Sequence, residues 1–185
     1  MRRLFLYLLI IITICSCRNH YDVCIYGGTS AGVTAAYSAA QMGKKVIVVS
    51  PDMRIGGRTT GGLGFTDIGN NQAVFGVAKQ FYRTLGKHYG RLESWIFEPS
   101  VALKVMEGYL DHPNIRVIKG FRIDGIKMEG SSIADIRVID TQGRETTVSA
   151  SYFIDATYEG DLMALTGVSY HVGREDNSVY GEEWN

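Results

Sequence analysis

Glycine, threonine and serine gather early in the chain in an order that could bind a charged ligand through the backbone. The run is Gly27-Gly28-Thr29-Ser30-Ala31-Gly32, between an apolar segment at 21–26 and an alanine-rich segment. A glycine turn that opens a helix presents backbone N–H groups where the helix dipole favours an anion. Thr29 replaces the middle glycine of the common G-x-G-x-x-G pattern, so its side chain must point away from the phosphates. The run predicts a site for the pyrophosphate of a dinucleotide, and an ordinary tight turn is the alternative.

A glycine-rich stretch at 54–70 holds a second set of residues that could bind phosphate. Within it, 56–64 reads GGRTTGGLG, with five glycines in nine residues. We expect neither a helix nor a packed strand here, because each glycine allows a positive φ or a close approach of backbone to a ligand. Arg58 could neutralise a phosphate, and Thr59 or Thr60 could hydrogen-bond to one. A mobile surface loop is the alternative.

A third candidate lies where a predicted buried strand at 152–157 ends in Asp155, Ala156 and Thr157. Open α/β sheets bind ligands at the carboxyl ends of their strands, so these residues would stand at the ligand edge of a sheet. Asp161 follows shortly after them. A helix N-cap at Thr157 or Asp161 would explain the pattern equally well.

The hydrophobic pattern supplies elements that could bring these candidates together. A strand at 21–26, a helix at 30–42 and an apolar strand at 44–50 form the βαβ unit of a dinucleotide-binding fold. The later elements are two amphipathic helices at 72–88 and 98–110, and strands at 115–119, 121–128, 133–140, 144–149 and 152–157. This order predicts an α/β fold, with a Rossmann-like parallel sheet and a three-stranded antiparallel β-meander insertion.

The composition is that of one folded domain. The chain has 185 residues, of which 45% are hydrophobic and 21% charged, and 19 basic residues balance 19 acidic ones. This balance gives no electrostatic reason to expect a nucleic acid partner. The four histidines lack the spacing of a metal site, so we expect no metal.

The N-terminus predicts export. Two arginines precede an apolar run at 4–14, which is shorter than the roughly 20 residues of a membrane-spanning helix. Residues 14–17 read ICSC and resemble the lipobox of bacterial lipoproteins. Cys17 is the expected lipidation site because a small serine precedes it, whereas the bulky Ile14 precedes Cys15. A cleaved signal without lipid, or an uncleaved anchor, is the alternative.

These features divide the chain into a lipoprotein-type signal peptide at 1–17, a tether at 18–20 and a domain at 21–185. We expect the protein in the bacterial cell envelope, anchored in a membrane by its lipid and facing the periplasm. Besides the modified cysteine, only Cys24 would remain after cleavage, so no disulfide is expected.

Together, the three candidate segments resemble the FAD-dependent oxidoreductase family with a glutathione-reductase-type Rossmann domain. The resemblance is closest to a bacterial group whose chains read G-G-[TG]-x-A-G, then G-G-x-x-x-G-G-L-G, then I-D-A-T-x-x-G-D. It extends from Tyr21 to the end of this sequence. It implies FAD as the cofactor and hydride transfer from a small-molecule substrate to the flavin, and it names no catalytic acid or base.

The resemblance also implies a place along FAD for each matching residue. These residues are Gly27, Gly28, Thr29, Ser30, Ala31 and Gly32 at the pyrophosphate; Gly56, Gly57, Arg58 and Thr59 near the phosphates and ribityl chain; Gly61, Gly62 and Leu63 at the flavin ring; Asp155, Ala156 and Thr157 over the pyrophosphate, with Asp161 further along; and Ile123 near the adenine.

Two features depart from the family pattern. Ser50 ends the second strand where the family usually places a glutamate for the adenosine ribose, and Asp52 follows it. A serine can hydrogen-bond to the ribose but adds no charge. Family members also continue well beyond this length, so we expect an incomplete domain, with a partner chain as one source of the missing part. The alternatives to an enzyme are a non-catalytic nucleotide-binding lipoprotein or truncated remnant, and an NAD(P)-binding module.

Overall fold

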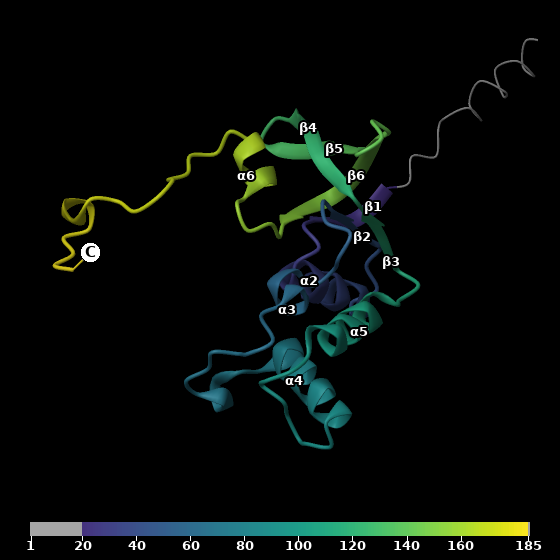
Figure 1. Ribbon diagram of the computed structural model, residues 1–185. Helices are drawn as coiled ribbons and strands as arrows, with labels where there is room; N and C mark the ends of the chain where they lie inside the picture. The colour runs from purple at the N-terminus through teal and green to yellow at the C-terminus, as the bar shows by residue number, and fades with distance from the viewer. Residues whose placement is uncertain (1–19, 185) are drawn as a thin grey trace, which may run out of the picture.

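A six-stranded sheet forms the centre of the computed structural model, which describes residues 20–184 (Figure 1). Its strands are β1 (His20–Tyr26), β2 (Val46–Ser50), β3 (Ile115–Lys119), β4 (Phe121–Glu129), β5 (Ser132–Asp140) and β6 (Glu145–Asp155). Their order across the sheet is β3-β2-β1-β6-β5-β4. β3, β2, β1 and the second half of β6 run parallel, whereas β4, β5 and the first half of β6 are antiparallel. The predicted Rossmann-like sheet with an antiparallel meander is confirmed.

Helices cover one face of the parallel strands (Figure 1). They are α2 (Ser30–Gln41) and α5 (Pro99–Leu110), with α4 (Gly76–His88) packed on them. Side chains alternate along a strand, so Ile25 of β1 and Val48 of β2 point to this face. They share a buried cluster with Val33 and Ala36 of α2, and none of the four is exposed. The small alanine lets α2 lie close to the sheet.

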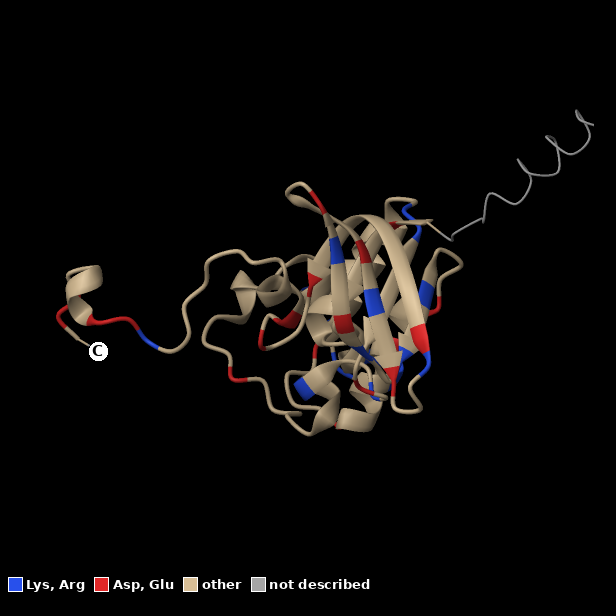
Figure 2. Ribbon diagram, turned by 90° about the horizontal axis from the view of Figure 1, so that it is seen from above, with Lys and Arg blue, Asp and Glu red and all other residues tan. Residues whose placement is uncertain are grey.

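The meander covers the opposite face. Tyr26 of β1 and Val49 of β2 form a second buried cluster with Ile136 of β5 and with Leu162 of the short helix α6 (Asp161–Leu165). Cys24 belongs to the same cluster, and burial raises the pKa of its thiol to about 12. Acidic and basic residues are interleaved on the outer strands of the meander (Figure 2). The parallel strands are therefore enclosed between helices and the meander.

The prediction of two separate strands at 144–149 and 152–157 is wrong. They form one strand, β6, which pairs antiparallel with β5 over 145–149 and parallel with β1 over 149–155. No glycine or proline interrupts the chain between the two halves, so the backbone passes directly from one partner to the other. β6 is also less buried than predicted, because Tyr152 is 72% exposed and Ile154 is 38% exposed.

The prediction that the glycine-rich stretch contains no helix is also wrong, because α3 (Gly57–Gly61) is a short helical turn. Side chains that bond to the backbone offset the low helix propensity of its glycines. The Thr60 hydroxyl donates to the Ile55 carbonyl, and Arg54 Nε donates to the Thr60 carbonyl at 2.6 Å.

The other boundaries shift by a few residues. β1 begins at His20, inside the predicted tether, and α2 ends at Gln41. β2 begins at Val46 rather than at 44. The helix predicted from residue 72 begins at Gly76, after the 3₁₀ turn η1 (Asn71–Ala73).

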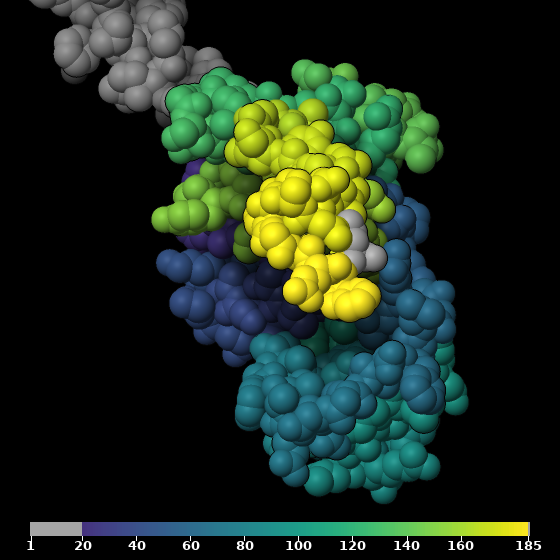
Figure 3. Space-filling view, turned by 90° about the vertical axis from the view of Figure 1, so that its left-hand side faces the viewer, coloured from purple at the N-terminus to yellow at the C-terminus, as the bar shows by residue number. Residues whose placement is uncertain are grey.

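The predicted signal peptide, with Cys17, lies outside the described residues. Within residues 20–184, no helix is both long enough and apolar enough to cross a membrane. After α6 the chain leaves the sheet, and its C-terminal segment, with the 3₁₀ turn η2 (Asn177–Val179), extends away from the domain (Figure 1). Figure 3 views the molecule from the side of this segment. Val172 and Trp184 on it are more than four-fifths exposed.

Candidate functional site

The glycine turn lies between the carboxyl ends of β2 and β6. Gly27 has a φ of +115°, and its N–H donates to the Val49 carbonyl at 2.8 Å. A Cβ on Gly27 would lie 2.6 Å from the Ala156 carbonyl, and one on Gly32 would overlap the Gly27 carbonyl oxygen. The turn therefore needs glycine at both positions, since any side chain would push β1, α2 and β6 apart.

Thr29 caps α2 with a side chain that points into the protein. Its hydroxyl donates to the Ala156 carbonyl at 2.7 Å and accepts from the Gly32 N–H at 3.3 Å. The first N–H groups of a helix have no partner within it. With the Gly32 N–H capped, and with the backbone around Thr29 bridged to Gly56, the Ala31 N–H is the first-turn group that is left for an anion.

The second glycine segment is tied directly to this turn. The Gly56 N–H donates to the Gly28 carbonyl at 2.7 Å, and the Ser30 hydroxyl donates to the Gly56 carbonyl at 2.8 Å. The hydroxyls of Ser30 and Thr59 share a further hydrogen bond of 2.7 Å. The tertiary structure thus brings the predicted phosphate-binding residues of both segments together.

An open cleft of about 570 Å³ lies beside the start of α3. Its lining residues come from the loop after β2, from α3 and its exit, and from the loop after β6: Asp52, Met53, Arg54, Gly57, Arg58, Gly61, Gly62, Leu63 and Tyr158. Volumes of this order are typical of ligand sites. Among the described residues, no carboxylate forms an ion pair with Arg54 or Arg58. The cleft is therefore suited to an anionic ligand.

Ser50 does not line this cleft. It is fully buried, its hydroxyl donates to the Asp52 carbonyl at 2.8 Å, and a Cβ on Gly28 would overlap it. Asp52 is exposed and does line the cleft. The acidic group on this side of the site is therefore Asp52 rather than the residue that ends β2.

The side chains of the third segment build a turn. The Asp155 carboxylate accepts from the Thr157 N–H at 2.9 Å, from the Thr157 hydroxyl at 2.7 Å and from the Met163 N–H at 2.9 Å. Burial raises the pKa of Asp155, but these hydrogen bonds outweigh it and hold the pKa below its ordinary value. The Thr157 hydroxyl accepts from the N–H groups of Gly160 and Asp161. These two side chains thus cap α6, and it is the backbone of Ala156 that touches the glycine turn.

Ile123 lies apart from the cleft. Its N–H donates to the Tyr26 hydroxyl at 2.8 Å, and its side chain packs against the cluster under the meander. Asp161 lies at the first turn of α6 with an exposed side chain. Neither residue lines the cleft beside α3.

Tyr158 is a cleft residue to which the sequence assigned no role. Its hydroxyl accepts from the Arg58 N–H at 2.9 Å, and the Arg58 guanidinium lies 4.9 Å from the centre of its ring. An aromatic residue directly after Asp-Ala-Thr was the only signal that could have pointed to it.

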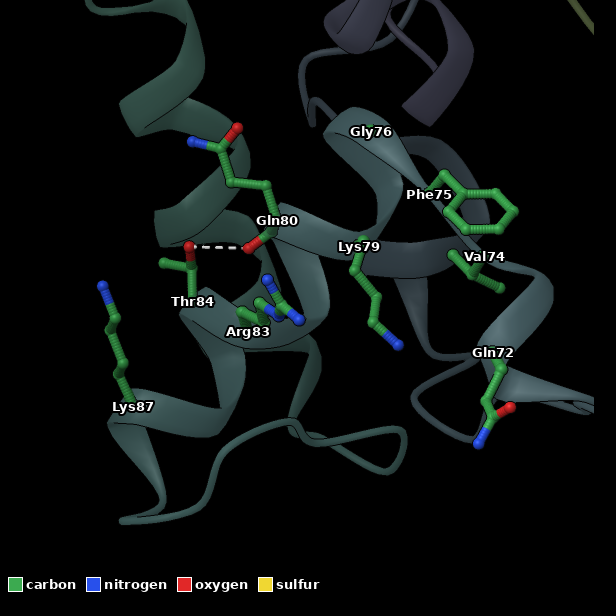
Figure 4. Close-up of a pocket in the computed structure, with 9 residues that line it drawn as sticks. All are labelled: Gln72, Val74, Phe75, Gly76, Lys79, Gln80, Arg83, Thr84 and Lys87. Atoms are coloured by element: carbon green, nitrogen blue, oxygen red, sulfur yellow. Dashed lines mark hydrogen bonds between the residues drawn. The ribbon is translucent and has the colours of Figure 1, made fainter.

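A second hollow of about 620 Å³ lies on α4 and contains none of the predicted residues (Figure 4). Two of its basic side chains, Lys79 and Arg83, form ion pairs with Glu93 at 3.0 Å and 3.3 Å. Because this carboxylate neutralises part of the charge, we do not include the hollow in the site.

Comparison with known proteins shows the family of the chain and its fold. The model of a family described as FAD dependent oxidoreductase matches residues 22–184. No curated protein matches the sequence.

Among solved structures, THI4 of Thermovibrio ammonificans is 16% identical with a TM-score of 0.58, and the match covers 89% of this chain and 69% of that one. A flavoprotein/dehydrogenase from Cytophaga hutchinsonii is 16% identical with a TM-score of 0.56, covering 85% and 44%. Glycerol-3-phosphate dehydrogenase from Bacillus halodurans, complexed with FAD, is 12% identical with a TM-score of 0.57, covering 83% and 37%. The chain also spans only 34% of the length of AlpK and of Mycobacterium smegmatis Sdh1.

Proposed function

Because the chain belongs to the FAD-dependent oxidoreductase family, we propose that it binds FAD at the glycine turn and the adjoining cleft, for hydride transfer from a small-molecule substrate. The flavin, when bound, supplies the redox chemistry, and the protein binds and orients it. The proposal assigns no catalytic acid or base.

The observation that carries the proposal is the convergence of two distant segments on one set of hydrogen-bond donors. The first-turn N–H of Ala31 lies at the start of α2, and hydrogen bonds join the neighbouring Ser30 to the segment that carries Arg58. Backbone N–H groups at a helix N-terminus and an unpaired guanidinium are both suited to a diphosphate. The residues present therefore fit the diphosphate of FAD.

The remaining candidate residues have supporting roles in this proposal. Gly56, Gly57 and Thr59 would flank the phosphates, while Gly61, Gly62 and Leu63 would approach the flavin ring. Asp155 and Thr157 would hold the turn that places Ala156 beside Gly27. Asp52, rather than the buried Ser50, would face the ribose. Ile123 would border the adenine through its side chain, since its N–H is bonded to Tyr26.

The test is retention of FAD by the purified chain. We expect a flavin absorption spectrum to persist after incubation with FAD and desalting, and Arg58→Ala to weaken FAD binding by about tenfold, as loss of one charge-assisted contact does. Arg91→Ala is the control, because Arg91 is exposed in the loop after α4 and does not line the cleft.

Three other outcomes would contradict the proposal or favour a different function. Retention of NAD(P)H instead of FAD would favour the nicotinamide-binding alternative. A chain that is folded by circular dichroism but retains neither would contradict the proposal. FAD retained without reduction by any of a panel of small alcohols, amines and hydroxy acids would favour a non-catalytic binding protein.

We further propose that a lipid on Cys17 anchors the protein in a bacterial membrane with the domain in the periplasm. Support comes from the two N-terminal arginines, the short apolar run and the lipobox-like ICSC. A partner chain that completes the substrate side of the site stays part of this proposal.

A further inference from the structure

Tyr158 and Arg58 form a contact between two walls of the cleft. Tyr158 belongs to the loop between β6 and α6, whereas Arg58 is in α3, a hundred residues earlier. The Tyr158 hydroxyl accepts the Arg58 N–H at 2.9 Å, and its ring lies 4.9 Å from the Arg58 guanidinium. One tyrosine therefore holds the backbone and the charged end of the same arginine.

Gly57 makes this contact possible. A Cβ on Gly57 would overlap the Tyr158 hydroxyl, so any other residue there would displace the tyrosine. Tyr158 is itself 54% exposed. Because so much of this residue faces solvent, burial of apolar surface contributes little to its position across α3. The contacts with Arg58 hold it there.

The chemistry of the contact leaves the arginine available to a ligand. A carboxylate partner would occupy the N–H edge of the guanidinium, as bidentate pairs do. An aromatic ring instead binds the flat face of the guanidinium. Since no carboxylate of residues 20–184 pairs with Arg58, the ring leaves its N–H donors available to a ligand and its charge is not neutralised.

We propose that Tyr158 is a positioning residue that holds the Arg58 guanidinium ready for the diphosphate of FAD. This inference rests on the proposed function. Ordering a long, flexible side chain on binding costs conformational entropy. An arginine ordered in advance avoids part of that cost, so the tyrosine would strengthen FAD binding through Arg58.

The test is a double-mutant cycle on the purified chain, with the dissociation constant for FAD measured by quenching of flavin fluorescence. We expect Tyr158→Ala to weaken binding by about fivefold, as loss of a partly exposed cation–π contact would. Tyr158→Phe, which keeps the ring, should weaken it by about twofold. In an Arg58→Ala background, Tyr158→Ala should have no further effect.

Two outcomes would overturn the inference. One is a Tyr158→Ala variant that binds FAD as tightly as the parent chain. The other is a Tyr158→Ala effect that persists undiminished without Arg58, since the tyrosine would then act on FAD directly. Tyr152→Ala is the matched control, because Tyr152 is an exposed tyrosine on β6 away from the cleft, and it should leave the dissociation constant unchanged.

Hydrogen exchange in the FAD-free chain gives a readout that is independent of binding. The Arg58 N–H should exchange faster in Tyr158→Phe, which removes its acceptor, and at an unchanged rate in Tyr152→Phe. Equal protection in parent and Tyr158→Phe chains would contradict the contact. The parent chain could also fail to bind FAD while the Arg58 N–H loses protection in Tyr158→Phe. That result would contradict the proposed function and would still confirm the contact between Tyr158 and Arg58.

Discussion

At the scale of single residues, the site depends on glycines, which have no side chain, as much as on side chains that form hydrogen bonds. Gly27, Gly28 and Gly32 each lie where a Cβ would overlap a neighbouring segment. Ser50 and Thr29 use their hydroxyls to bond to carbonyls within the protein. The residues around the turn therefore hold the backbone in place, and the backbone N–H groups are left to meet a ligand.

Gly32→Ala tests the closest of these contacts. We expect it to lower the free energy of unfolding by about 2 kcal/mol or more, because its Cβ would overlap the Gly27 carbonyl and force α2 away from β1. Gly108→Ala is the control, since Gly108 is exposed on α5 with no atom near its Cβ position. It should raise stability by up to about 1 kcal/mol through helix propensity. Urea denaturation measures both, and equal effects would contradict the packing described.

At the scale of elements, the ends of strands and helices carry the site. α2 and α3 begin beside each other because hydrogen bonds join Ser30 to Gly56 and Thr59. α6 is short, and the turn of Asp155 and Thr157 holds its start at the end of β6. Each of these junctions uses a side chain that also fits an ordinary capping pattern, which is why the sequence alone left capping and binding open.

Asp155→Asn tests the junction between β6 and α6. In the unfolded chain the pKa of an aspartate is about 3.9. In the folded chain the pKa of Asp155 is lower. Its stabilisation is therefore present above about pH 4 and is lost as the pH falls through the folded pKa. We expect Asp155→Asn to cost about 1 kcal/mol at pH 7 and progressively less below pH 4.

Denaturation at several pH values measures this cost. Glu159→Gln is the control, because Glu159 is exposed in the same loop and should have no effect at any pH. A cost of Asp155→Asn that is the same at pH 3 and pH 7 would contradict the charged hydrogen bonds.

At the scale of the whole molecule, one sheet serves two functions. Its parallel half brings β1, β2 and β6 to a common edge where the glycine turn lies, and its antiparallel half covers the face opposite the helices. β6 belongs to both halves, so the turn after β6 stands beside the glycine turn without any further connection. The C-terminal segment lies outside these layers (Figure 1).

The proposed anchor belongs to the same scale. We expect Cys17→Ser to abolish incorporation of labelled palmitate and to release the chain from the membrane fraction, because the acceptor thiol is gone. Cys15→Ser should leave both unchanged. Labelling that survives Cys17→Ser and disappears in Cys15→Ser would assign the lipid to the other cysteine, and no labelling of the parent chain would contradict the anchor.

The sequence by itself determined the class of fold and the cofactor family. Apolar runs locate β1 and β2, an alanine-rich segment locates α2, helical periodicity locates α5, and glycines mark the turns, because these signals are local in the sequence. Glycine content misled in one place, since side-chain bonds from Thr60 and Arg54 stabilise α3. Those hydrogen bonds join residues that are close in the sequence, but no sequence pattern predicts them.

Only the tertiary structure decided which residues meet. It joined two predicted strands into β6, because strand identity depends on partners that are distant in sequence. In the folded chain Ser50 is buried against Gly28, whereas Asp52 lines the cleft. The Ile123 N–H donates to the Tyr26 hydroxyl. The tertiary structure also brought Tyr158 onto Arg58. Contacts of this kind depend on the packing of whole elements, so a pattern read along the chain identifies the candidate residues and the fold selects their partners.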